Sequence, residues 1–167
     1  MAIGSRVEAI DRRLSNATEV SGYRFVEMLN ARIYGKTWDE STRLALDALC
    51  DNVHDRLYTK AAPHPFMAPT CESMGRSTAS ANASDAYNAA RRNLIYAIIE
   101  QQERGANARS QMEIVRDKRT AENQLVAFLT FTGFMGDELA RQYVRDFEGM
   151  VKREVHVGVA PAVMVGR

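Results

Sequence analysis

Residues 91–119, RRNLIYAIIEQQERGANARSQMEIVRDKR, decide the fold and hold six arginines in twenty-nine positions. Apolar residues recur between these charges with the spacing of a single helix face, on both sides of Gly105. A glycine just past such a face is a typical helix stop. The turn is short enough to make the two helices antiparallel neighbours, and Asn107 is the expected cap of the second helix. The segment therefore predicts a helix hairpin with guanidinium groups around its corner.

Further amphipathic stripes predict an all-α fold class, a four-helix bundle with a long internal loop and extended N- and C-terminal tails. The hairpin helices are expected at 85–104 and 107–129, with further helices at 19–34, 38–57 and 137–153. A chain of 167 residues suffices for one core and is short for two, so residues 1–167 are expected to form a single domain. Its parts are an N-terminal arm at 1–18, a mobile proline- and serine-containing loop at 60–84 and a C-terminal tail at 154–167, whose alternating valines suit a short strand or an extended segment.

The basic residues are unusual in type rather than in number. The formal net charge is only +1, yet eighteen of the twenty-two basic residues are arginine. Arginine presents a planar fork of donors that matches phosphate and carboxylate, which favours fixed anionic partners. A GC-rich coding sequence would also enrich arginine and is the alternative explanation.

No segment predicts secretion or a membrane span. The N-terminal residues lack an apolar stretch of signal-peptide type, and nowhere do eighteen apolar residues run together. The two cysteines, Cys50 and Cys71, do not make a disulfide framework. A reducing, cytoplasm-like compartment is therefore expected.

Motifs of catalysis and of metal binding are missing from the sequence. Cys50 and His54 lie four residues apart on one expected helix face, but no second ligand pair follows. No phosphate-binding glycine loop and no nucleophile elbow occurs. The chain is therefore expected not to be an enzyme and to carry no cofactor and no metal. A bundle enzyme or ligand carrier, with a site assembled from distant residues, is a further interpretation.

The arginines at the hairpin corner are the candidate phosphate contacts: Arg104, Arg109, Arg116 and Arg119. Acidic residues between them weaken any single basic patch, which argues against a monomer that grips nucleic acid by net charge. Weak binding by each subunit, repeated along an extended strand, fits better because avidity multiplies it. The alternative is a helix pair laced by intrachain ion pairs, such as Glu100 with Arg104.

The order of these features resembles the coat proteins of rod-shaped plant RNA viruses, the tobamovirus-like group. Three stretches carry the resemblance: WDESTRLALDALCDNVHDRLYTKAAPHPF, LIYAIIEQQERGANARSQMEIVRDKRTAENQL and RDFEGMVKREVHVGVAP. In the last, Arg145 and Phe147 lie one residue closer than in the family's Arg-x-x-Phe-Glu segment. The family's arginine-phenylalanine-proline stretch is replaced by HPFMAP, and its terminal tryptophan is missing. The alanine- and serine-rich loop is more similar to coat proteins of flexible filamentous viruses, which is the alternative within this class.

The resemblance implies a helical assembly of subunits around single-stranded RNA. By position, Arg104, Arg116 and Arg119 would contact phosphates, and Asp117 or Glu122 would be the acidic residue near the nucleotides. Glu100, Glu103 and Glu113 would be carboxylates crowded between subunits, where like charges raise pKa values.

Two functions of different classes are therefore expected from the sequence. The first is a structural capsid subunit that self-assembles into a rod or filament and packages single-stranded RNA. Its partners would be RNA and further copies of the chain, without a membrane, and its location the virion and the host cytoplasm. The second is a small helical adaptor or regulatory protein, from a phage or a bacterium, that binds a protein partner through amphipathic helices.

Overall fold

The computed structural model describes residues 3–33, 39–58, 79–103 and 109–159, and it confirms the all-α class: six helices and no strand lie within these ranges. The helices are α1 (Ile3–Leu14), α2 (Gly22–Ile33), α3 (Glu40–Tyr58), α5 (Ala79–Gln102), α6 (Gln111–Phe131) and α7 (Asp137–Val159). None of the helices described carries an apolar stretch of the length that crossing a bilayer requires.

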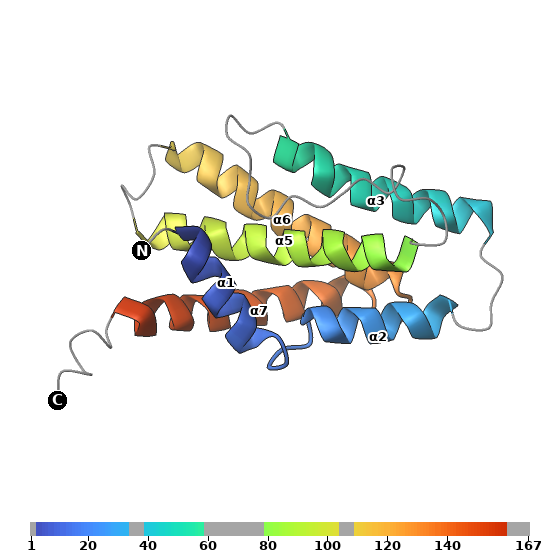
Figure 1. The fold of residues 1–167 in the computed structure, drawn as a ribbon, viewed down its shortest axis with the longest axis horizontal. Helices are drawn as coiled ribbons and strands as arrows, with labels where there is room; N and C mark the ends of the chain where they lie inside the picture. The colour runs from blue at the N-terminus through green and yellow to red at the C-terminus, as the bar shows by residue number, and fades with distance from the viewer. Residues whose placement is uncertain (1–2, 34–38, 59–78, 104–108, 160–167) are drawn as a thin grey trace.

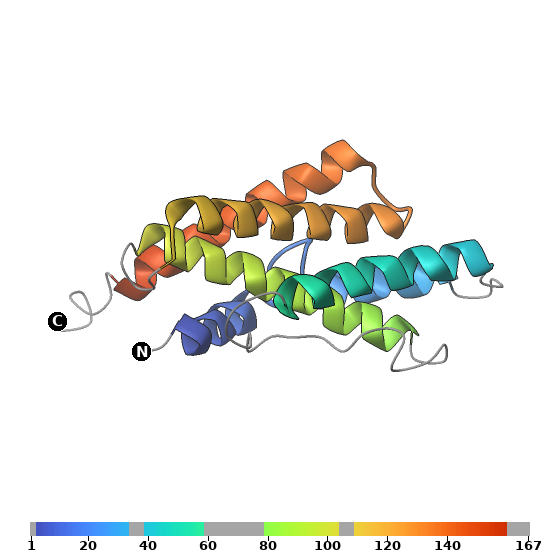
Figure 2. The same ribbon diagram turned by 90° about the horizontal axis from the view of Figure 1, so that it is seen from above.

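Helix α5 forms the axis of the fold. It packs against each of the other five helices named above, with α6 as its most extensive neighbour. Figure 1 shows α3 and α6 along one side of α5, and α2 and α7 along the other, while α1 crosses obliquely. Figure 2 shows α6 and α7 as an antiparallel pair joined by a tight turn. The core is therefore arranged around one helix rather than between four equivalent ones.

The N-terminal segment is part of this core, which corrects the expected arm at 1–18. Val7, Ile10 and Leu14 of α1 are spaced three and four residues apart and are all buried. Arg13, in the last turn of α1, forms an ion pair with Glu154 of α7. The four-helix expectation is not confirmed, because this short helix buries a full apolar stripe.

The alanine- and serine-rich residues before Asp85 are helical, which corrects the expected loop at 60–84. Helix α5 begins at Ala79, while the rest of that segment, up to residue 78, lies outside the described residues. Alanine has the highest helix propensity, and its small side chain allows close packing. Gly22 at the start of α2 comes so near that a Cβ there would lie 2.3 Å from the side-chain oxygen of Asn88. Of the small residues before Asp85, Ala83 is buried in the core.

The C-terminal valines are also helical as far as the structure describes them. Helix α7 continues to Val159, so the expected tail at 154–167 begins later, and residues 160–167 lie outside the described part. Val151 and Val155 are both buried and lie four residues apart. The alternation of valines suggests a strand, but every fourth position fits the apolar stripe of this helix.

Three aromatic rings fix the packing of α2, α5 and α6. Phe25 and Tyr87 stack with ring centroids 4.1 Å apart, and Phe128 meets both edge-on at 5.6 and 5.8 Å. All three are fully buried. The hydroxyl of Tyr87 donates to the backbone carbonyl of Val20 at 2.7 Å, so its polar atom is satisfied. Burial raises the pKa of Tyr87, which keeps the phenol neutral.

A charged side chain lies at the centre of this apolar core. Arg91 of α5 is 1% exposed, and its Nη1 donates to Oδ1 of Asp11 in α1 at 2.6 Å. Arg92 donates through Nε to the other carboxylate oxygen at 2.8 Å. The ring of Phe147 in α7 lies 5.1 Å from the guanidinium carbon of Arg91, a cation–π distance. Arg91 therefore joins three helices through one side chain.

The turn between α6 and α7 depends on Gly133. Its φ of +78° lies in the left-handed region, which residues with a Cβ rarely adopt. A Cβ at this position would also meet Nη1 of Arg32 at 2.9 Å. The glycine therefore sets the direction in which α7 leaves α6.

We predict that Asp11→Ala lowers the free energy of unfolding by about 3 kcal/mol, because it leaves the cation of Arg91 buried without its carboxylate. The double variant Asp11→Leu with Arg91→Met should recover most of this loss, since the buried charge is removed together with its partner. Urea unfolding followed by circular dichroism measures both effects. A double variant as unstable as the single one would contradict this account of the pair.

Candidate functional site

The corner of the α5–α6 hairpin is built by a helix cap. Helix α6 begins at Gln111, and the Oγ atom of Ser110 accepts from the backbone N–H of Glu113 at 3.2 Å. The hydroxyl of Ser110 also donates to the carboxylate of Glu113 at 3.1 Å. Ser110 is therefore the N-cap of α6, in place of the expected Asn107. Arg104 and Asn107 lie outside the described residues.

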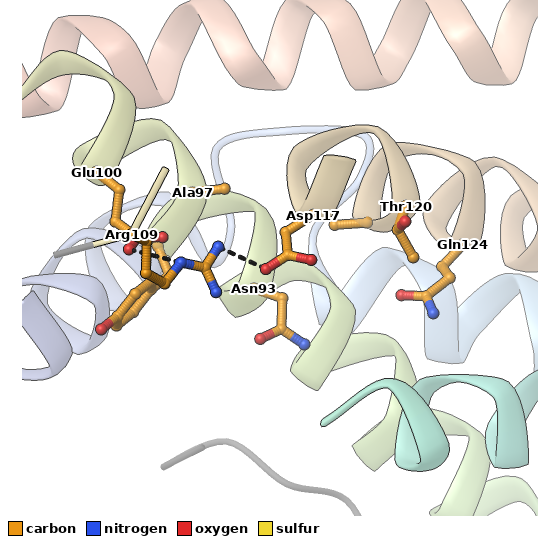
Figure 3. A pocket seen from close by; sticks show the side chains of 9 residues that line it. Asn93, Ala97, Glu100, Arg109, Asp117, Thr120 and Gln124 are labelled. Atoms are coloured by element: carbon orange, nitrogen blue, oxygen red, sulfur yellow. Dashed lines mark hydrogen bonds and ion pairs between the residues drawn. The ribbon is translucent and has the colours of Figure 1, made fainter. Parts of the chain in front are cut away.

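Arg109 lies between two carboxylates of its own chain (Figure 3). Its Nη2 donates to Oδ2 of Asp117 at 2.5 Å, and its Nε lies 3.2 Å from Oε2 of Glu100. Glu100 comes from α5 and Asp117 from α6, so the guanidinium ties the two helices of the hairpin together. The pocket around them is lined further by Asn93, Thr120 and Gln124 and has room for about one water molecule.

These contacts stabilise the charged form of Arg109. Burial by itself would lower the pKa of Arg109, but the hydrogen bond with Asp117 and the charges of Glu100 and Asp117 outweigh it, so the pKa is raised. Arg109 and Asp117 are therefore engaged with each other. Both residues pair within the chain in this conformation, and their contact with RNA stays a prediction.

The three carboxylates expected between subunits have different surroundings. Glu100 is 2% exposed and lies 3.2 Å from Nε of Arg109, so in this conformation it is buried inside its own hairpin rather than exposed for a contact between subunits. The carboxylate of Glu103 accepts hydrogen bonds from Nη1 and Nη2 of Arg6 in α1, so it is paired within the chain. Glu113 is exposed and takes part in the helix cap. Of the three, only Glu113 has the exposure that the predicted role requires.

Two of the candidate arginines have no intrachain partner among the described residues. Arg116 and Arg119 are exposed and lie one turn apart on α6. Neither makes a hydrogen bond or an ion pair with any residue that the structure describes.

Arg119 also lines a groove between α6 and α7, which we call the arginine groove. Its lining residues are Arg119, Glu122, Asn123, Val126, Arg141, Val144, Arg145 and Glu148, around a volume of about 320 Å³. Arg141 and Arg145 lie four residues apart on α7, and the antiparallel packing of α6 brings Arg119 to the same groove. The sequence shows this spacing, but only the pairing of α6 with α7 places the three arginines together.

The acids of the arginine groove are compensated by a lysine. The ammonium group of Lys118 lies 3.3 Å from a carboxylate oxygen of Glu148 and 3.8 Å from one of Glu122. Arg141 pairs with Asp137 at 2.8 Å, while Arg145 donates to the neutral side chain of Gln142 at 2.8 Å. With Asp137 counted beside the two lining carboxylates, the three arginines and Lys118 leave one net positive charge, so the groove favours an anionic ligand.

Metal-binding geometry does not occur in the described part of the chain: no three or more His, Cys, Asp or Glu side chains gather there. Of the pair noted in the sequence, Cys50 is buried in the core cluster, and the side chain of His54 lies outside the described residues.

No protein-family model matches the sequence, and neither a curated protein nor a solved structure matches it. The assignment of the candidate site is therefore based on the charges and distances of the residues described above.

We predict that Glu103 stabilises the fold only above the acid range. The hydrogen bonds from Arg6 lower the pKa of Glu103 below its ordinary value of 4.5, so the carboxylate is charged in the folded state where it would otherwise be protonated. The stability it contributes is complete above pH 4.5 and is lost as the pH falls through its lowered pKa.

The measurement is urea unfolding of the natural chain and of Glu103→Gln between pH 7 and pH 3. The difference in free energy of unfolding should be constant down to about pH 4.5 and should shrink below it. A difference that grows on acidification would contradict the assigned pair.

Proposed function

We propose that the chain is a structural subunit that binds single-stranded RNA and assembles into a helical filament, with the arginine groove and Arg116 as the contact surface for phosphates. The observation that carries the proposal is the pair of exposed arginines on α6, Arg116 and Arg119, which have no partner among the described residues. The expected contacts Arg109 and Asp117 are replaced by Arg141 and Arg145 of α7.

The spacing of these arginines suits a chain of phosphates. Arg116 and Arg119 lie three residues apart on α6, which corresponds to about 4.5 Å along the helix. Arg141 and Arg145 lie on the opposite wall and are four residues apart, or about 6 Å. Forked guanidinium donors on both walls can contact successive phosphate oxygens without reading base edges. Sequence-independent contact of this kind is what a subunit that packages a whole RNA requires.

The overall charge supports repeated rather than isolated binding. A net charge of +1 gives the monomer little long-range attraction for a polyanion. A few arginine contacts per subunit become strong only when many subunits share one strand. The proposed affinity for RNA therefore depends on assembly of the subunits. The binding of an adaptor protein to its partner would not depend on assembly.

We predict that Arg116→Ala with Arg119→Ala weakens binding to single-stranded RNA by about tenfold or more and leaves the helix content unchanged, because both side chains are exposed. The slope of log affinity against log salt should fall by about 0.7 for each phosphate that the variant no longer neutralises. Fluorescence anisotropy with labelled oligonucleotides measures both quantities. A matched control, Arg12→Ala with Arg153→Ala, removes two exposed arginines outside the groove. Equal weakening by the two double variants would contradict the assigned surface.

We further predict that the chain forms filaments or rods with RNA at raised protein concentration. Sedimentation velocity and negative-stain electron microscopy, with and without single-stranded RNA, test this over a concentration series. The alternative function, a small adaptor that binds a protein partner, predicts a species of constant small size with or without RNA. That result would exclude the proposed capsid role.

A further inference from the structure

A second groove lies between α2 and the start of α7, away from the arginine groove. Six of its nine lining residues are apolar or aromatic: Met28, Ala31, Phe134, Met135, Leu139 and Tyr143, around a volume of about 370 Å³. Phe134 is 57% exposed and Leu139 is 44% exposed, which is unusual for large apolar side chains that lie together. We call this feature the apolar groove.

The rim of the apolar groove is acidic. Glu19, Arg24 and Glu27 complete its lining. Arg24 pairs with Glu19 at 3.2 Å and lies 3.9 Å from Glu27. Two carboxylates face one guanidinium, so the rim keeps one net negative charge. A matching occupant would be apolar with a basic group beside it.

A segment of the chain itself has this composition. Residues 160–167 read APAVMVGR: apolar residues around Met164 are followed by Arg167. The segment contains no acidic residue, and Pro161 near its start disfavours continuation of a helix. Its order of apolar residues and then a cation is complementary to the floor and the rim of the apolar groove.

The position of the segment along α7 prevents it from filling the groove of its own copy. Leu139 in the groove and Val159 at the end of α7 are twenty residues apart, or about 30 Å along the helix. Met164 follows Val159 by five residues, which span at most about 17 Å when extended. Figures 1 and 2 both show α7 running from the turn with α6 to the opposite end of the molecule.

We infer that residues 160–167 of one copy bind in the apolar groove of the next copy, with Met164 and its neighbouring valines on Phe134 and Leu139, and Arg167 at the acidic rim. The groove and the segment lie at opposite ends of α7, so copies that each bind the next one in the same direction are joined head-to-tail, whereas two copies that exchange their segments would form a closed dimer. A head-to-tail contact leaves a groove at one end and a segment at the other, and it continues as an open chain unless it closes into a ring. This contact rests on the self-assembly part of the proposed function and does not require RNA.

The test uses the full-length chain without RNA, together with two kinds of variant. One kind lacks residues 160–167. The other places a charge in the groove, as Leu139→Asp on α7 or Ala31→Arg on α2, both at exposed positions. Met112→Asp, at an exposed apolar residue outside the groove, is the matched control. Circular dichroism checks that each variant is folded.

Sedimentation velocity should show concentration-dependent association of the natural chain and of Met112→Asp. The truncated chain and each groove variant should need about tenfold higher concentration, or more, to associate. A mixture of the truncated chain with Leu139→Asp should form a one-to-one dimer, because one copy supplies an intact groove and the other an intact segment. Ala31→Arg gives a second groove variant on the other wall.

Three outcomes would overturn the contact: a natural chain that stays monomeric at every concentration, truncation without effect on association, or a mixture that stays monomeric. RNA binding by the same proteins is measured separately by anisotropy. The truncated chain, which keeps Arg116 and Arg119, should still bind short oligonucleotides. The double variant Arg116→Ala with Arg119→Ala should still associate without RNA. Failure of the head-to-tail contact is thereby distinguished from failure of RNA binding.

Discussion

The fold depends on one buried ion pair, that of Arg91 with Asp11. A guanidinium that is 1% exposed must have its charge compensated, and this constraint places α1 against α5. The ring of Phe147 brings α7 to the face of the same group. Helix α1 would otherwise be a short polar segment with a single apolar stripe. The buried cation makes its position specific, and with it the arrangement of the helices that carry both grooves.

Pairing inside the chain determines which charged groups are available for a partner. Arg109 and Asp117 neutralise one another, and Arg6 occupies Glu103. Arg116 and Arg119 on α6 lack such acids among the described residues, whereas on α7 Arg141 pairs with Asp137 and Arg145 donates to the neutral Gln142. A count of basic residues gives only a net charge. The division between structural and available arginines follows from which helix each one faces.

The helical class and the hairpin around Gly105 could be predicted from periodicity, because the apolar stripes there are long and regular. Composition suggests a loop at 60–84 and a strand or an extended tail for the valines after Arg153, but the described parts of these segments, residues 79–84 and 154–159, are helical. In the structure, Ala83 is buried in the core, and Val151 and Val155 belong to the apolar stripe of α7. The exposed state of Arg116 and Arg119 fits their expected role, whereas Arg109 and Glu100 face each other across the hairpin. That Arg141 and Arg145 line one groove with Arg119 could not be predicted from the sequence, because it depends on how α6 packs against α7.

Helix α7 is a wall of both grooves, and this has a thermodynamic consequence. Val144 and Arg145 line the arginine groove, while Leu139 and Tyr143 line the apolar one. If a ligand in one groove displaces α7, the affinity of the other groove changes as well, and linkage then requires that the effect be equal in both directions.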